Sequence, residues 1–287
     1  RGIVYINPDV MKHSLVSMAD TGVKSIMFAG EGESVAHKDI GDFVQTAKTN
    51  GLDVSITTNG VLFNKRKREQ CLPNLSWIRF SIDSGSPENY SMIHGTKQKD
   101  FGRVIYKIEE SVKLRNELGL ETTIGAQFLV LPQNIGEAVK LGKILKDVGA
   151  DNLQIKPYSH HPDSRNNFSL DMQKYNSIED ELNKLNSNKF KVLFRRATAE
   201  RIEEGATYPK CYGTPFFALV DCRGNVIPCN LFYGNEEFTF GNLNETNFKE
   251  IWNGEKRKRV LEKLYKKDIS KCRRGCRLDA DNRYLHR

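Results

Sequence analysis

Residues 25–33 read SIMFAGEGE, a short apolar run that ends in a glycine-rich, acidic loop. Residues 52–60 (LDVSITTNG) and 77–85 (WIRFSIDSG) repeat this arrangement, with a β-rich run followed at once by polar residues or glycine. Two further runs, 122–131 (TTIGAQFLVL) and 152–156 (NLQIK), also have the composition of strands. In parallel sheets ligands bind where loops converge over the carboxyl ends of the strands, so this edge is the predicted site.

Segments with helical periodicity separate the predicted strands. Residues 100–118 and 135–148 each carry an apolar stripe at helical spacing. Asn7 followed by Pro8 is predicted to begin the first helix, because asparagine caps helices and proline suits the first turn. The alternation of strands and helices predicts an α/β fold with a parallel sheet, open or closed. Residues 168–200 are charged and are predicted to be helical.

The composition fits a globular chain of one large or two modest domains, with 287 residues, 38% of them hydrophobic, and a net charge of +8. Residues 254–287 hold thirteen Lys/Arg against five Asp/Glu, so this tail carries the whole charge excess. Because residues 255–267 place Val260, Leu261 and Leu264 on one helical face, a solvated amphipathic helix is favoured over a nucleic-acid-binding tail. With no apolar run of about 18 residues and no signal-peptide pattern, we expect a cytoplasmic protein without a membrane partner.

The cysteines point to a metal site. Five of the six follow residue 210, and such clustering indicates metal binding rather than disulfides in a cytoplasmic protein. Residues 223–225 (RGN) predict a hairpin turn between Cys222 and Cys229. Four soft thiolates suit either zinc or an iron–sulfur cluster. The sixth, Cys71, stands alone near the end of a predicted helix and is interpreted as a buried structural thiol.

In their order and spacing these features resemble the radical S-adenosylmethionine enzymes that carry a C-terminal auxiliary-cluster domain of the SPASM or twitch type. The resemblance implies a partial (β/α)6 TIM-like barrel over residues 1–166, a helical linker over 167–205 and a small cysteine-rich α+β domain over 206–287. The matching segments, in chain order, are residues 28–33, 57–60, 80–84, 124–127 and 134–135, then Cys211, Gly224, Cys229, residues 240–243 and 251–252, Cys272 and Cys276.

The resemblance also implies that S-adenosylmethionine binds at the carboxyl edge of the sheet. Asn59 is expected either to contact it or to be a turn residue in the left-handed conformation. Lys156 suits a carboxylate or solvent, and residues 158–165 (YSHHPDSR) suit a hydroxylated or charged substrate or a polar loop. The other expected contacts are Gly30, Gly32 and Glu33 at the methionine ammonium, Ser81 and Asp83 at the ribose, and Gly125 and Gln127 near the adenine; on residue type alone, Glu33, Ser81 and Asp83 suit ordinary loop acids and caps equally well.

For the cysteines, the resemblance implies one auxiliary [4Fe–4S] cluster on Cys211, Cys229, Cys272 and Cys276. Cys222 is then a spare thiol or a replacement for one of the four. The basic neighbours of Cys272 and Cys276 are expected to offset the negative charge of the cluster. Enzymes of this family hold a second [4Fe–4S] cluster in a CxxxCxxC loop, which this sequence lacks. We expect that loop and its cluster on a segment ahead of the sequence, so that this chain alone is not a competent enzyme.

The implied reaction is hydrogen abstraction from a small-molecule or peptide substrate by a 5′-deoxyadenosyl radical. The auxiliary cluster would assist by electron transfer or by binding the substrate, and a donor such as flavodoxin or ferredoxin would supply reducing electrons. Two alternatives stay open. One is a zinc-stabilised interaction or nucleic-acid-binding module, and the other is a homologue that binds S-adenosylmethionine but has lost the chemistry.

Overall fold

The structure is a computed structural model that describes residues 3–30, 32–166, 168 and 171–287. Within these residues a six-stranded sheet has the strands in chain order, and every neighbouring pair is parallel. Its strands are β1 Ser25–Phe28, β2 Asp53–Thr58, β3 Trp77–Ser81, β4 Thr123–Val130, β5 Asn152–Pro157 and β6 Lys191–Phe194.

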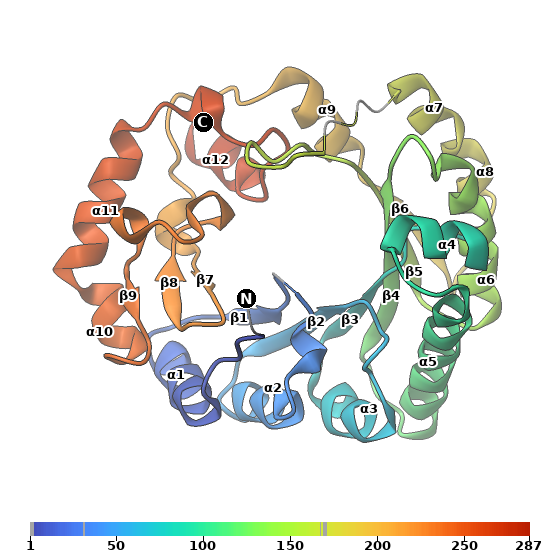
Figure 1. Cartoon of the computed structure of the whole chain (residues 1–287), viewed down its shortest axis with the longest axis horizontal. Coiled ribbons are helices and arrows are strands. Elements are labelled where there is room, and N and C mark those ends of the chain that lie inside the picture. The colour runs from blue at the N-terminus through green and yellow to red at the C-terminus, as the bar shows by residue number, and fades with distance from the viewer. Residues whose placement is uncertain (1–2, 31, 167, 169–170) are drawn as a thin grey trace.

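Helices cover the convex side of this curved sheet (Figure 1). The first begins as predicted, because the Asn7 side chain accepts the N–H groups of Asp9 and Val10 at 2.9 and 3.3 Å. The helices are α1 Pro8–Asp20, α2 Ile40–Thr49, α3 Lys65–Cys71, α4 Pro87–His94, α5 Gln98–Glu117, α6 Ala138–Asp147, α7 Met172–Ser177, α8 Glu179–Asn183 and α9 Arg196–Glu204.

The two faces of the sheet differ in chemistry because side chains alternate along each strand. Residues such as Ile56, Phe80 and Phe128 are fully buried under the helices and form the core. Their neighbours on the concave side include the polar side chains of Arg79 and Gln154, beside apolar ones such as Leu193. A packed TIM barrel fills its interior with branched apolar side chains, so a concave face that contains charged and polar groups is suited to a ligand. The predicted α/β partial barrel is confirmed.

One segment departs from the sequence prediction. Residues 168–200 are predicted to be helical, as part of a helical linker over residues 167–205. This prediction is wrong for residues 191–194, which form β6, pair in parallel with β5 and extend the sheet by one strand. The cause is tertiary: four residues, KVLF, contain too little pattern to predict a strand, and they become one only against the open edge of β5.

The C-terminal segment, residues 206–287, lies across the open side of the curved sheet (Figure 1). The predicted hairpin is confirmed, since β7 and β8 are antiparallel and Gly224 between them has φ +82°. The apolar face of α11 is buried, as predicted for Val260, Leu261 and Leu264. The elements of the C-terminal segment are β7 Leu219–Val220, β8 Asn225–Ile227, β9 Gly241–Asn242, α10 Phe248–Asn253, α11 Glu255–Lys266 and α12 Asp279–Leu285.

The C-terminal segment contacts the sheet domain at both of its ends. The Lys249 N–H of α10 donates to the Ser17 hydroxyl of α1 at 3.0 Å. At the other end Arg201 of α9 pairs with Asp279 of α12 at 2.9 Å. These two contacts hold the C-terminal segment over the concave face of the sheet, although the two are far apart in the sequence. None of the described helices has the length and apolar character needed to cross a membrane.

Candidate functional site

Glu33 ties together the loops that follow β1 and β2. Its carboxylate accepts hydrogen bonds from the Val35 N–H at 2.9 Å, the Thr58 hydroxyl at 2.8 Å and the Asn59 N–H at 2.7 Å. A carboxylate has about four acceptor positions, so little of its capacity is left for a ligand. Glu33 therefore shapes the carboxyl edge of the sheet, a role that the sequence did not signal because Thr58 lies 25 residues away.

Glycine is required at the tip of the loop after β1. Gly30 and Gly32 have φ +114° and +83°, which a residue with a side chain adopts only under strain. A Cβ atom on Gly30 would lie 3.9 Å from the Tyr233 hydroxyl of the C-terminal segment. The first loop of the rim thus faces that segment. Glu31, between the two glycines, lies outside the described residues.

Asn59 is exposed and makes a local turn, in which its side-chain oxygen accepts the Val61 N–H at 2.9 Å. The expectation of a left-handed conformation is wrong for this residue, since no described residue other than glycine has a positive φ. The next residue, Gly60, takes that conformation with φ +78°. A Cβ atom there would lie 2.8 Å from the Phe80 ring, so close packing also requires glycine.

Asp83 lies just beyond the end of β3 and bridges to β4. Its carboxylate accepts the Leu129 N–H at 2.7 Å. Its own N–H donates to Nε2 of His94 at 3.2 Å, so this nitrogen carries no proton and the two side chains, 3.9 Å apart, are not an ion pair. The buried Asn134 side chain donates to the carbonyls of Asp83 and Leu129, both at 2.9 Å. These bonds hold the ends of β3 and β4 together.

Burial raises the pKa of Asp83 to about 6, against the opposing effect of the Leu129 N–H, and burial lowers the pKa of His94. Because the folded-state pKa lies above the unfolded value, ionised Asp83 reduces stability above pH 6, and this cost disappears as pH falls toward 4. Asp83→Asn should therefore raise the melting temperature at pH 7.5 by about 2 to 4 °C and have little effect near pH 4. His94 and Tyr90 of α4 are the other titratable groups beside it.

Calorimetric scans across this pH range test the prediction, with Asp20→Asn, at an exposed carboxylate of α1, as the matched control. A pH-independent difference between Asp83→Asn and the parent chain would show that removal of the buried charge is not the cause.

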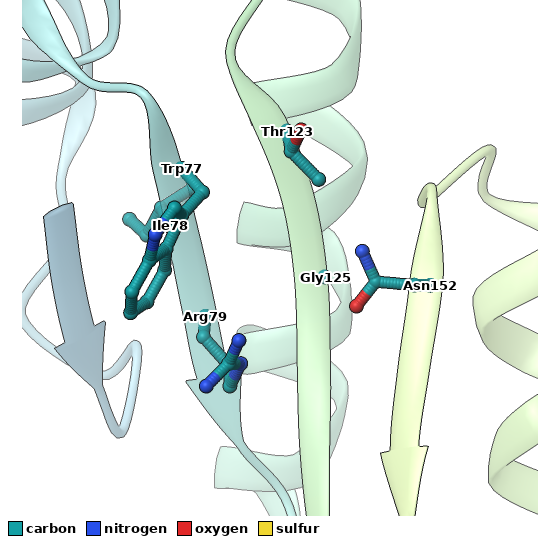
Figure 2. A pocket seen from close by; sticks show the side chains of 6 residues that line it. All are labelled: Trp77, Ile78, Arg79, Thr123, Gly125 and Asn152. Carbon is teal, nitrogen blue, oxygen red and sulfur yellow. The ribbon is translucent and has the colours of Figure 1, made fainter. Parts of the chain in front are cut away.

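Ser81, Gln127 and Gly125 lie on the concave face. Ser81 ends β3 and pairs in register with Gln127 of β4, and both are half-buried. Gly125 pairs with Arg79 and so lies two residues deeper, toward the amino-terminal side of the sheet. A Cβ atom on Gly125 would collide with the Asn152 amide of β5. Of these three residues, Gly125 lines a small cavity of about 140 Å³, together with Trp77, Arg79 and Asn152 (Figure 2).

The structure brings four of the six cysteines into one electrostatic neighbourhood. The thiols of Cys211, Cys272 and Cys276 all act on Cys229, Cys211 and Cys276 act on Cys272, and Cys211 acts on Cys276. Burial, and then the field of the other thiolates, raises the pKa of Cys229 to about 12 and that of Cys272 to about 11. Exposed Cys222 takes no part in this group, and Cys71 is fully buried in α3, as predicted.

Hydrogen-bond donors contact two of the four sulfur atoms. The Leu278 N–H donates to Cys276 at 3.4 Å, and the Asn282 amide donates to Cys211 at 3.5 Å. Arg277 lowers the pKa of Cys276, against the larger effect of burial, so its positive charge favours the thiolate. Among the described residues, however, no three His, Cys, Asp or Glu side chains come close enough together to hold a single metal ion.

Comparison with known proteins identifies this cysteine segment. Residues 211–277 match the SPASM family model, described as an iron-sulfur cluster-binding domain. The cysteine segment is therefore similar to SPASM domains, which supports the resemblance of the chain to radical S-adenosylmethionine proteins. The SPASM match contains all four of the clustered cysteines, together with exposed Cys222.

Full-length relatives fit this assignment. A tungsten-containing aldehyde ferredoxin oxidoreductase cofactor-modifying protein of Pyrococcus furiosus is 26% identical over 82% of this chain and 68% of its own. A probable GTP 3′,8-cyclase of Methanocaldococcus jannaschii is 29% identical over 51% of this chain, which spans about half (47%) of the cyclase. SuiB of Streptococcus suis, solved with S-adenosylmethionine and also with its precursor peptide SuiA, superimposes with a TM-score of 0.67 in the former complex. At 17% identity, over 86% of this chain and 58% of SuiB, this likeness concerns the fold alone.

The loop after β5 has a structural role that sequence reasoning missed. Ser159 is buried, and its hydroxyl and carbonyl accept hydrogen bonds from Arg273 of the SPASM domain at 3.0 and 2.9 Å. Its hydroxyl also donates to the Arg274 carbonyl. His160 is hydrogen-bonded to the Asn166 carbonyl, and His161 accepts the Asp163 N–H, so both histidines bond within their own loop. The loop therefore docks the SPASM turn, residues 272–277, onto the barrel, and a serine in a polar loop carries no sequence signal for this.

Proposed function

We propose that the protein is a radical S-adenosylmethionine enzyme that modifies a small molecule or a peptide inside the partial barrel. The observation that carries the proposal is the SPASM cysteine group placed opposite a polar sheet face whose carboxyl edge is shaped by glycine and carboxylate loops. Bound at that edge beside a reduced cluster, S-adenosylmethionine would supply a 5′-deoxyadenosyl radical for hydrogen abstraction. A donor such as flavodoxin or ferredoxin would provide the electrons.

The chain's own contribution is to bind, orient and exclude water. Gly30 and Gly32 leave backbone groups accessible for the methionine ammonium, and Glu33 holds their loop against the loop after β2. Ser81 and Asp83 are proposed at the ribose. Gln127, in register with Ser81, is proposed near the adenine. Gly125, two residues earlier on the same strand, is proposed near the adenine as well.

We assign Cys211, Cys229, Cys272 and Cys276 as the ligands of one auxiliary [4Fe–4S] cluster. A tetrahedral zinc site needs its thiolates about 3.8 Å apart, given a Zn–S distance of about 2.3 Å. A four-iron core holds them farther apart. Four thiols that share one field without forming a compact single-ion site therefore favour the cluster over zinc.

The deciding experiment is anaerobic reconstitution of the native protein, with every residue that its gene encodes, followed by incubation with S-adenosylmethionine and dithionite. We expect reductive cleavage that yields 5′-deoxyadenosine. Binding of S-adenosylmethionine without any cleavage would support the homologue that has lost the chemistry. Recovery of zinc without sulfide would support the zinc-stabilised module instead.

Glu33→Gln is expected to weaken S-adenosylmethionine binding at least tenfold. The new amide would point one N–H group at the Asn59 N–H, so one of three hydrogen bonds is lost and a donor is left facing a donor. The loops after β1 and β2 then separate. Isothermal titration with S-adenosylmethionine measures the effect, with Glu69→Gln, at an exposed acid of α3, as control. Equal affinity in the two variants would contradict a role for Glu33 in shaping the binding edge.

A further inference from the structure

A group of cations converges on the concave face without acidic partners. We call it the interior cationic cluster. Two of its members come from the sheet, one follows the last strand, and two come from the SPASM turn. They are Arg79 of β3, Lys156 of β5, Arg195 after β6, and Arg273 and Arg277.

The first three members lie at different depths of the sheet. Gly125 of β4 pairs with Arg79 on one side and with Asn152 of β5 on the other, and Lys156 lies four residues beyond Asn152, nearer the carboxyl edge. The Arg79 guanidinium lies over the Trp77 ring at 4.5 Å and lines the cavity of Figure 2. Arg195 donates its N–H to the Ile155 carbonyl at 3.0 Å, which sets it level with Lys156, and its guanidinium donates to Gln154 at 3.3 Å.

The SPASM turn supplies the remaining two. Arg273 is fastened to Ser159, three residues beyond Lys156, by the two hydrogen bonds described above. Arg277 lies over the Phe217 ring at 5.5 Å. Burial, and then Arg273, Arg195, Arg277 and Arg79 in that order, lower the pKa of Lys156 to about 8. Each of the four arginines is therefore close enough to Lys156 to repel it.

No acid balances this charge in the described part of the chain. Its ion pairs all involve other cations, such as Arg115 with Asp151 and Arg201 with Asp279. An auxiliary cluster with a net charge of about −2 would offset only part of it. S-adenosylmethionine would not help, because it has one carboxylate against an ammonium and a sulfonium. Arg195 and Arg277 are exposed, whereas Arg79, Lys156 and Arg273 are half-buried, and like charges that are partly desolvated are best retained where a counter-ion compensates them.

We propose that the interior cationic cluster binds a substrate carrying two or more negative charges, as phosphate or carboxylate groups. The inference rests on the proposed function, since it names the substrate class of the same barrel. Arginine forks suit both groups, because each presents paired oxygen atoms in the required geometry. The position of Lys156 and Arg273, on the side of the barrel next to the SPASM cysteines, would set such a substrate between the sheet and the auxiliary cluster.

The test is isothermal titration of the reconstituted protein with pyrophosphate and, separately, with tricarballylate. We expect saturable binding of at least one anion, weakened at least tenfold in Lys156→Met and in Arg79→Gln. Lys146→Met and Arg66→Gln remove the same charges from exposed positions and should bind as the parent does. Tighter binding of pyrophosphate would identify phosphate groups in the substrate, and tighter binding of tricarballylate would identify carboxylates. Thermal melts of each variant confirm that it is folded.

Two results would overturn the inference: no saturable binding of either anion, or equal loss in the exposed control variants. S-adenosylmethionine is titrated into the same samples. Retained S-adenosylmethionine binding without anion binding defeats the substrate class alone, whereas anion binding without S-adenosylmethionine binding defeats the proposed function alone. The pH adds a second readout, because anion affinity should fall as pH rises through about 8 and Lys156 loses its proton.

Discussion

Replacement of Cys276 by alanine is expected to remove the iron from the SPASM domain. Reconstitution of the parent chain should give about four irons and four sulfides per chain at this site, and the variant should retain fewer than one. A cluster deprived of one of four thiolates exposes an iron to solvent, and here the lost ligand is one that the Leu278 N–H orients. Metal and sulfide analysis with Mössbauer spectroscopy measures the outcome, and Cys211→Ala should behave in the same way.

Cys222 offers a matched control for this experiment. It belongs to the same cysteine-rich segment but is exposed and does not act on the thiols of Cys229, Cys272 or Cys276, so Cys222→Ala should keep the full iron content. Loss of iron in Cys222→Ala but not in Cys276→Ala would transfer the ligand role to Cys222. Zinc in place of iron, with no sulfide, would remove the cluster from the proposal altogether.

Asp279→Asn should lower the free energy of unfolding by about 2 to 4 kcal/mol. Asp279 is almost completely buried, and its carboxylate pairs with Arg201 at 2.9 Å and Arg283 at 2.8 Å. It also accepts the Tyr208 hydroxyl at 3.1 Å. An asparagine amide would point a donor at two guanidinium groups and leave them without a counter-charge. Both arginines reach solvent in part, which keeps the cost below that of a fully buried pair.

Urea denaturation is the suitable measurement, because guanidinium chloride would screen the ion pairs. Asp281→Asn, an exposed acid on the same helix, should change the free energy of unfolding by no more than about 0.5 kcal/mol. Similar values for the two variants would mean that the Asp279 network does not hold α12 against α9. Because Asp279 follows Cys276 by three residues, its loss should also reduce iron retention, though less than loss of a ligand.

Local sequence determined much of this protein. The five strands from residue 25 to residue 157, the helix cap at Asn7, the hairpin at Gly224 and the buried face of α11 all follow from periodicity and turn chemistry within short windows. Cysteine clustering likewise indicated a metal site, and the resemblance to a known family indicated the SPASM domain. These features depend on interactions between residues only a few positions apart, which is why their patterns are visible in the chain.

Tertiary structure decided the rest. The strand β6 forms only because β5 offers an open edge. Glu33 joins two loops only because the loop after β2 folds beside it and donates the Asn59 N–H. The interior cationic cluster joins residues separated by almost two hundred positions. No local pattern encodes contacts between residues so far apart in the sequence, because hydrogen bonds and charge interactions depend on distance in space. The curvature of the sheet and the docking of Arg273 on Ser159 bring these groups close to one another.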